Sequence, residues 1–453
     1  MKQNFLSNFK KVYFVGIGGV SMSALAKFLH TNGFIVSGSD LNKSNLTTQL
    51  EELGIKVYYS HGIENVLAVD LVVYTSAISV KNPELCYARE NGIPTITRSE
   101  LLNEALSNYK KSVAVAGSHG KTTTTAMIMD VLSISGNDPT VFLGGEYGEV
   151  GNFRLGNSDY AVCEACEYKK AILDISPKIS VVLNIDNDHL ECYYGMEDMV
   201  ESFKRFVGDK LAVINADDKY ADYLSNQTTV TFGIYKSANY YATNVVANKQ
   251  GTSFTACANS RRYGRINMKL MGEHNVYNAL CAFAVCDLMG VSFSVIKKAL
   301  EEFKGVKRRL EFLGKVNGVE CYADYAHHPK EIKATLSAFS LKGEGFLVVF
   351  QPHTYSRTKL LLDEFVDAFK DYKNLIIYKT FPARESYDRF GSARVLYKRL
   401  INEQVQKLSY AQGYNQLVEG IKKQSEGIKR IIFLGAGDIY SLAEKYSLKN
   451  GKK

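Results

Sequence analysis

Ala-Gly-Ser-His-Gly-Lys-Thr-Thr-Thr-Thr, residues 116–125, is the stretch on which the fold of this chain depends. An apolar run at 112–115 precedes it, and apolar residues with helical spacing follow it at 126–132, which predicts a strand, a tight turn and a helix. Such a turn aims backbone N–H groups at a phosphate, and the start of the helix adds a partial positive charge. The stretch therefore predicts a phosphate-binding loop in an α/β domain.

The residue types of this loop match that chemistry. Gly117 and Gly120 let the backbone approach a phosphate closely, Lys121 can reach the outer phosphates, and the Thr122 hydroxyl can bind Mg²⁺. The common P-loop has four residues between its glycines, whereas this chain has two. The alternative is an ordinary strand–helix turn that contains Gly-Lys-Thr by chance, and the agreement of turn, lysine, hydroxyl and flanking elements disfavours it.

Length and composition describe a multidomain globular protein. The chain has 453 residues and a formal net charge of +8, from 55 basic and 47 acidic residues, and this length predicts about two to four domains. No basic run dominates, so we expect no nucleic-acid partner. The N-terminus lacks a signal-peptide pattern and no apolar run is long enough to span a bilayer, so we expect no membrane insertion and a cytoplasmic location.

The first part of the chain has a dinucleotide-binding pattern. A buried-strand run at 12–15 leads into Gly16-Ile-Gly-Gly-Val-Ser21, then a helical stretch, then a strand that ends at Asp40. This is nearly the Rossmann fingerprint, with Ser21 in place of the third glycine and Asp40 near the spacing of the ribose-binding acid. The pattern predicts that Gly16, Gly18 and Gly19 hold a diphosphate and that Asp40 binds the ribose attached to it. Alone it would also fit an NAD-dependent oxidoreductase.

Two further positions follow strands of this first unit. Ser76 and Ala77 come just after an apolar run at 70–74, where open α/β sheets bind their ligands. Arg98 follows the next strand and could face an anion. A solvated surface arginine is an equally good interpretation of Arg98.

Polar residues also follow the strands of the second part. Glu164 ends an apolar run at 160–163, and His189 follows another at 179–185. Because parallel strands end at one edge of a sheet, we expect Glu164 and His189 to converge on Lys121 and Thr122, where a carboxylate can complete a Mg²⁺ shell. Farther along, Asn275 and Asn278 open a helix and could bind an adenine edge; capping of the helix by Asn275 is the alternative.

The last part predicts a second Rossmann-like unit. Asp324, His327, His353 and Arg357 all fall at predicted strand ends, where loops carry function. The predicted organisation is α/β in three domains: a Rossmann-like domain at 1–107, a P-loop ATPase domain at 108–310 and a Rossmann-like domain at 311–453.

Taken in order, these segments resemble one family over nearly the whole chain, the Mur ligases, and the last two segments point to its alanine-adding branch. The segments that carry the resemblance are Gly16-Ile-Gly-Gly, Gly117-Ser-His-Gly-Lys-Thr-Thr-Thr-Thr, Glu164-Ala-Cys-Glu, Asn184-Ile-Asp-x-Asp-His189, His274-Asn-x-x-Asn278, Arg308-Arg309, Asp324-Tyr-Ala-His-His-Pro and Gln351-Pro-His-Thr-Tyr-Ser-Arg-Thr. One departure is Ser118, where the family usually has Thr, and the hydroxyl is kept. The resemblance implies that the first glycine loop holds a UDP-sugar rather than NAD.

The resemblance also implies a reaction. ATP, with Mg²⁺, phosphorylates the lactyl carboxylate of UDP-N-acetylmuramate, and the amine of L-alanine attacks the acyl phosphate, in peptidoglycan precursor synthesis. Cations are needed because the carboxylate and the γ-phosphate repel each other strongly at low dielectric. The protein is expected to be a monomer or a weak homodimer and to close its domains around ATP.

Residue roles follow from the resemblance. Lys121, His189 and Arg357 are expected to be catalytic, with Arg357 on the alanine carboxylate or the acyl phosphate. The metal ligands are expected to be Thr122, Glu164 and His189. The expected ATP contacts are Gly117, Ser118, His119, Gly120, Lys121, Thr122, Thr123, His274, Asn275, Asn278, Arg309, Asp324 and His327. The expected UDP-sugar contacts are Gly16, Gly18, Gly19, Asp40, Ser76, Ala77 and Arg98.

Three alternatives remain open at this point. The recycling ligase that joins a tripeptide to the same UDP-sugar shares most of these segments. An NAD-dependent oxidoreductase explains Gly16 to Asp40 and leaves the P-loop unexplained. A P-loop protein that hydrolyses ATP without ligation is the third. Lys204 lies near the place of a carbamylated lysine in sister ligases, and we expect it to be an ordinary solvated helix lysine.

Overall fold

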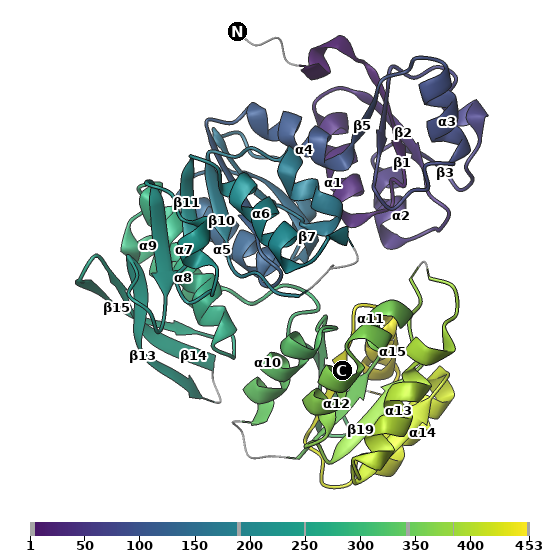
Figure 1. Cartoon of the computed structure of the whole chain (residues 1–453), viewed down its shortest axis with the longest axis vertical. Coiled ribbons are helices and arrows are strands. Elements are labelled where there is room, and N and C mark those ends of the chain that lie inside the picture. The colour runs from purple at the N-terminus through teal and green to yellow at the C-terminus, as the bar shows by residue number, and fades with distance from the viewer. Residues whose placement is uncertain (1–4, 188–191, 249–250, 341–344, 384, 451–453) are drawn as a thin grey trace. The chain divides into compact units, whose positions relative to one another are not determined.

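The computed structural model describes residues 5–187, 192–248, 251–340, 345–383 and 385–450 (Figure 1). The chain divides into two compact units. The first unit comprises Met1–Val246, Ser253–Lys269 and Glu273–Phe303, and the second comprises Ala247–Thr252, Leu270–Gly272 and Lys304–Lys453. The first unit holds the first sheet and most of the second, and the second unit holds the third. The expected α/β class with three sheet domains is confirmed, and the domain limits at 107 and 310 stay predictions.

The first sheet is wholly parallel, with strand order β3-β2-β1-β4-β5. Its strands are β1 (Lys11–Val15), β2 (Ile35–Ser39), β3 (Lys56–Tyr58), β4 (Leu71–Tyr74) and β5 (Thr95–Thr97). Its helices are η1 (Phe5–Asn8), α1 (Val20–Thr31), α2 (Asn45–Glu52), η2 (Ile63–Val66), α3 (Pro83–Glu90) and α4 (Arg98–Ser107). The strand order reverses at β1, so the glycine loop after β1 lies at the switch point where such sheets bind ligands.

The second sheet has ten strands in the order β15-β14-β13-β12-β11-β10-β6-β9-β7-β8. They are β6 (Lys111–Ala116), β7 (Thr140–Tyr147), β8 (Gly151–Arg154), β9 (Tyr160–Glu164), β10 (Ile179–Val182), β11 (Leu211–Asn215), β12 (Thr229–Gly233), β13 (Tyr240–Asn248), β14 (Gly251–Ala258) and β15 (Arg261–Met268). The helices are α5 (Lys121–Ile134), η3 (Tyr168–Asp174), α6 (Met196–Val207), α7 (Ala221–Leu224), α8 (His274–Leu288) and α9 (Phe293–Glu302). β6 pairs in parallel with β10 and β9, so the P-loop leaves the sheet between two neighbours whose own ends carry polar residues.

The third sheet, in the second unit, has the order β16-β17-β21-β18-β19-β20. Its strands are β16 (Glu311–Val316), β17 (Val319–Asp324), β18 (Phe346–Phe350), β19 (Asn374–Tyr378), β20 (Lys407–Ala411) and β21 (Arg430–Leu434), and all pairings but β16–β17 are parallel. Its helices are α10 (Pro329–Ser340), α11 (Tyr355–Leu360), α12 (Leu362–Phe369), η5 (Arg389–Gly391), α13 (Ala393–Asn402), α14 (Tyr414–Gln424) and α15 (Ile439–Asn450).

Within the first unit, α1 joins the first sheet to the second. Phe28 packs edge-on against Phe142 of β7 and Phe153 of β8, with ring centroids 5.4 and 6.2 Å apart. Asn152 of β8 is fully buried and donates to the Val20 carbonyl at 2.6 Å. This contact is both apolar and hydrogen-bonded, and Figure 1 shows α1 running beside β7.

Among the helices in the described ranges, none is both long enough and apolar enough to cross a bilayer.

Candidate functional site

The P-loop begins where β6 ends and depends on two glycines. Gly117 has φ +139° and Gly120 has φ +87°, a backbone region that side chains disfavour. A Cβ at Gly117 would lie 3.0 Å from the Leu183 Cβ, and one at Gly120 would lie 2.5 Å from Asn278 Oδ1. The two glycines are therefore required both by backbone angle and by the closeness of neighbouring segments.

Asn184, just after β10, binds the backbone of the P-loop through three hydrogen bonds. Its main-chain carbonyl accepts from the Ser118 N–H at 3.1 Å, and its side-chain oxygen accepts from the His119 N–H at 2.8 Å. Its amide donates to the His119 carbonyl at 3.1 Å. No role was predicted for Asn184 itself. Its position just after a predicted strand was the available sequence signal. That this side chain meets the P-loop could be known only once β10 was seen to lie beside β6.

Lys121 points back over the loop. Its ammonium donates to the Gly117 carbonyl, to the Ser118 carbonyl at 3.3 Å and to both carboxylate oxygens of Glu167, each at 3.0 Å. Burial alone would lower the pKa of Lys121, but the nearby carboxylates, chiefly Glu167, outweigh it and raise the pKa above its ordinary value. Lys121 is therefore a permanent cation at the loop.

Thr122 and Glu164 meet beside this lysine. The Thr122 hydroxyl donates to Glu164 Oε2 at 3.0 Å, and the Gly144 N–H donates to the other carboxylate oxygen. A hydroxyl and a carboxylate are oxygen ligands of the type that hard divalent cations use. The predicted convergence of Glu164 on the P-loop is thus present. His189, the third predicted ligand, lies outside the described residues.

The start of α8 reaches the loop from the other side. The Thr124 hydroxyl donates to Asn278 Oδ1 at 3.2 Å, and the Asn278 amide donates to Asn275 Oδ1 at 3.1 Å. The N-cap position of α8 is Glu273, so Asn275 lies inside the helix rather than capping it. His274 Nε2 lies 3.1 Å from the Asn275 amide nitrogen. The three predicted ATP contacts of this segment therefore lie in the first turns of one helix beside the P-loop.

A second candidate site lies at the glycine loop after β1. Gly16 has φ +85°, and the Gly18 N–H donates to Asp40 Oδ2 at 3.0 Å. A Cβ at Gly18 would lie 2.8 Å from the same oxygen, so the carboxylate that the spacing predicted does reach the loop. Gly19 is the N-cap of α1. Arg98 donates to the Ser21 hydroxyl at 3.0 Å, which places it at this loop rather than free in solvent.

The loop after β4 lies against the same glycines. A Cβ at Gly16 would meet Thr75 Cγ2 at 3.2 Å and Ile78 at 3.4 Å. Between them, Ser76 accepts a hydrogen bond from Lys169 at 2.6 Å through its carbonyl, and the Ala77 N–H donates to the Thr75 hydroxyl at 3.5 Å. The predicted residues after β1, β2 and β4 are thus brought to one edge of the sheet.

Glu84, a buried acid near this edge of the sheet, was not predicted, because no pattern in the sequence marked it. Glu84 of α3 is fully buried and accepts from the Tyr13 hydroxyl at 2.7 Å, the Ser39 hydroxyl at 2.6 Å and the Asn65 amide at 2.9 Å. His61 Nδ1 lies 2.9 Å from the same carboxylate. Burial raises the pKa of Tyr13. Glu84 thus ties together four segments that are separate in the sequence.

In the second unit, Asp324 accepts hydrogen bonds from the backbone near the end of β17. Its carboxylate accepts from the N–H groups of Leu310 at 2.7 Å and Ala326 at 2.8 Å. Burial raises the pKa of Asp324, opposed by the charge of Arg309. Arg309 and His327 share Glu331, at 3.7 Å and 3.2 Å. Arg309, Asp324 and His327 therefore lie together near the end of β17, with Glu331 beside two of them.

His353 and Arg357 adjoin this group. The His353 ring lies 5.7 Å from the His327 ring and stacks on Phe381 at 5.5 Å, and Arg357 Nη1 lies 3.3 Å from His353 Nδ1. Burial, together with the charges of His327 and Arg357, lowers the pKa of His353 to about 3. His353 is therefore neutral at physiological pH, beside a permanently charged guanidinium.

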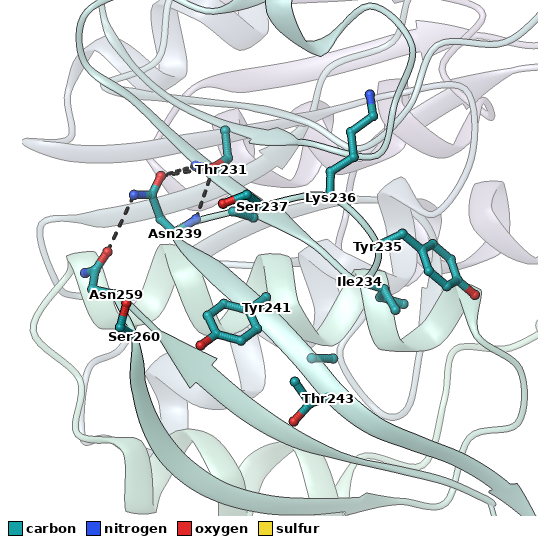
Figure 2. Close-up of a pocket in the computed structure, with 12 residues that line it drawn as sticks. Thr231, Ile234, Tyr235, Lys236, Ser237, Asn239, Tyr241, Thr243, Asn259 and Ser260 are labelled. Carbon is teal, nitrogen blue, oxygen red and sulfur yellow. Dashed lines mark hydrogen bonds between the residues drawn. The ribbon is translucent and has the colours of Figure 1, made fainter.

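A pocket of about 610 Å³ opens on the outer strands of the second sheet (Figure 2). It is lined from the β12–β13 segment and from the turn between β14 and β15, where Asn259 and Ser260 lie. Asn239, in the segment between β12 and β13, lines it and accepts from the Thr231 N–H at 2.8 Å. No site residue predicted from the sequence lines this pocket, and its hydrogen bonds join the strands to each other.

Comparison with known families finds matches along the chain. Residues 11–110 match the model described as Mur ligase family, catalytic domain. Residues 115–286 match the Mur ligase middle domain, and residues 308–437 match the Mur ligase, glutamate ligase domain. Each matched segment covers one of the three sheets, except that the second begins within β6.

Individual relatives match over nearly their full length. The UDP-N-acetylmuramate–L-alanine ligase of Acetivibrio thermocellus is 43% identical over 97% of this chain and 96% of the relative. The enzyme of the same name from Caldanaerobacter subterraneus subsp. tengcongensis is 40% identical over 99% of both chains. Among solved structures, the UDP-N-acetylmuramate–alanine ligase of Thermotoga maritima has 31% identity and a TM-score of 0.83 over 97% of this chain and 98% of that one.

Proposed function

Because the chain belongs to the Mur ligase family, we propose that it joins L-alanine to the lactyl carboxylate of UDP-N-acetylmuramate at the expense of ATP, in peptidoglycan synthesis. The observation that carries this proposal is the full-length match to relatives named UDP-N-acetylmuramate–L-alanine ligase. The P-loop geometry supports the use of ATP, and the glycine loop after β1 supports a nucleotide diphosphate.

The order of steps follows from carboxylate chemistry. A free carboxylate is a poor acyl donor because its oxygen is a poor leaving group. Transfer of the γ-phosphoryl group from ATP to the lactyl carboxylate gives an acyl phosphate and ADP. The alanine amine then attacks the acyl carbon, the amide forms as phosphate leaves, and the amine loses a proton. The site must exclude water during this sequence, since water would hydrolyse the acyl phosphate.

We assign the positive charge at the transferring phosphoryl group to Lys121. Its four carbonyl and carboxylate contacts keep the ammonium at the mouth of the loop, and a cation there stabilises charge that develops during transfer. The N–H groups of the loop and the start of α5 supply further positive charge. In this assignment Gly117, Ser118, His119, Gly120, Lys121, Thr122 and Thr123 contact the phosphates.

We assign Mg²⁺ to Thr122 and Glu164. Their oxygens already lie 3.0 Å apart at the phosphate loop, which fits an ion that prefers oxygen ligands. Bound there, Mg²⁺ would neutralise phosphate charge and so reduce its repulsion of the lactyl carboxylate. His189 stays a predicted ligand of a second ion.

The remaining roles are proposed from the likeness to the Mur ligases. We propose that His274, Asn275 and Asn278 hold adenine, since amide groups can pair with its edge. Arg309, Asp324 and His327 are proposed to contact the ribose and phosphates, with Arg357 at the alanine carboxylate or the acyl phosphate.

For the UDP-sugar, the glycines after β1 bring backbone close to the diphosphate and Arg98 offers it a cation. The Asp40 carboxylate accepts a hydrogen bond from the Gly18 N–H. This bond holds the carboxylate at the loop, where it could bind a ribose hydroxyl. The proposed UDP-sugar contacts are Gly16, Gly18, Gly19, Asp40, Ser76, Ala77 and Arg98.

The experiment that tests the function is phosphate release by the purified protein with Mg-ATP and UDP-N-acetylmuramate, with L-alanine present or absent. Release that needs both co-substrates, together with a UDP-sugar–alanine product by mass spectrometry, is the expected result. Activity with the tripeptide and none with alanine would replace the proposal by the recycling ligase. Release that needs neither would make the protein an ATPase without ligation.

A further inference from the structure

A buried carboxylate that none of the roles above uses lies beside the catalytic lysine. The Glu167 side chain is 1% exposed, and the Lys121 side chain is 17% exposed. Both Glu167 oxygens lie 3.0 Å from the Lys121 ammonium. Within the part of the chain that the structure describes, Lys121 is the side-chain partner of this carboxylate.

The donor count of Lys121 leaves no room for a phosphate. An ammonium group has three N–H donors. The Gly117 carbonyl, the Ser118 carbonyl and the Glu167 carboxylate account for all three. A phosphate oxygen that binds Lys121 must therefore displace one of these acceptors.

Glu167 is the partner with which a phosphate competes most directly. Both are anions, and at low dielectric each attracts the ammonium more strongly than a neutral carbonyl does. The backbone at Glu167 is fixed separately, since its carbonyl accepts from the Tyr193 hydroxyl and from the Lys170 N–H at 2.9 Å. The carboxylate can therefore lose its partner without release of the segment that carries it.

We propose that Glu167 is a positioning residue that acts through Lys121: it holds the ammonium at the loop before nucleotide binds, and it competes with the nucleotide phosphates for that ammonium. The competition weakens the binding of ATP and of ADP, so that the product leaves. This inference rests on the proposed use of ATP and names a residue that sets nucleotide affinity.

The test is the affinity of the full chain for a fluorescent ATP analogue and for ADP, by titration without sugar or amino acid. Glu167→Gln keeps the shape and removes the charge, so both nucleotides should bind at least about three-fold more tightly. In a Lys121→Met background the same change should alter affinity less than about two-fold, because no ammonium remains to compete for. Additive effects of the two changes would overturn the proposal.

Tyr193→Phe is the matched control. It removes the hydroxyl that binds the Glu167 carbonyl and leaves the ion pair intact, so nucleotide affinity should stay that of the wild type. Thermal unfolding of each variant shows that it is folded. If Glu167→Gln lowers only the unfolding temperature and leaves affinity unchanged, Glu167 is a structural residue and the proposal is wrong.

This result is separate from that of the ligase assay. Tighter binding by Glu167→Gln in a protein that does not ligate alanine would leave this inference standing and the proposed function wrong. Unchanged binding in a protein that does ligate alanine would leave the proposed function standing and this inference wrong.

Discussion

Lys121 differs in its surroundings from Lys204, another helix lysine that the structure describes. It is the side chain that the loop carbonyls and a buried carboxylate hold in one place. Lys204, by comparison, donates to the Ser225 carbonyl at 3.0 Å and lies over the Tyr223 ring. The same residue type thus lies at the phosphate loop in one case and on the last turn of α6 in the other.

We expect Lys121→Met to lower kcat for alanine-dependent phosphate release by about a hundred-fold or more, because a cation that faces developing phosphate charge is lost. Steady-state phosphate release with saturating substrates measures this. Lys204→Ala is the matched control and should keep most of the activity. A loss at Lys204 comparable to that at Lys121 would contradict the assignment and would favour a metal-bridging lysine.

At the scale of elements, the site is a set of strand ends. β6, β9 and β10 are parallel neighbours, and the P-loop, Glu164 and Asn184 follow them. α8 then supplies Asn278 from a segment far along the chain. Two glycines allow close approach to the loop from both sides. At Gly117 the neighbours are the Leu183 Cβ and the Asn184 backbone, and at Gly120 the neighbour is the Asn278 side chain.

Gly120 and Gly136 allow a matched test of this point. Their φ angles are +87° and +84°, and a Cβ at Gly136 would meet nothing within 4 Å. Alanine at either position should lower stability by about 1 kcal/mol through backbone strain. Only Gly120→Ala should also weaken ATP binding, because its Cβ would strike Asn278. Denaturant unfolding and nucleotide titration measure the two effects, and equal ATP affinities would contradict the packing argument.

At the scale of the whole molecule, the chain forms two compact units with separate cores. The first two sheets share one core, which α1 completes by packing on β7 and β8. The third sheet carries its own cluster of titratable side chains at the ends of β17 and β18. The free energy of unfolding therefore depends on how these side chains are protonated.

His353 makes stability depend on pH in a known direction. Its folded-state pKa of about 3 lies below the ordinary value of 6.5, so the unfolded chain binds more protons between these two values. The free energy of unfolding should therefore fall as pH decreases from about 6.5 to about 3. Urea unfolding across this range measures the slope, and His353→Gln should flatten it. An unchanged slope in the variant would contradict the burial of a neutral imidazole.

The sequence by itself determined the elements and the chemistry of each loop. Glycines at positive φ, a lysine and hydroxyls at a helix start, and carboxylates after apolar runs are local patterns, and local backbone sterics and periodicity fix their meaning. For this reason the α/β class, the P-loop, the glycine loop after β1 and the approach of Glu164 and Asp40 were predictable before any contact was known.

Only the tertiary structure decided which distant groups meet. The clamp of Asn184 on the loop, the Lys121–Glu167 ion pair, the contact of Asn278 with Thr124 and the burial of Glu84 join segments separated by tens to more than a hundred residues. No local pattern encodes these pairings, because they depend on strand order and on which faces pack together. The sequence thus predicted the candidate site residues, and the packing of the sheet decided what holds those that the structure describes in place.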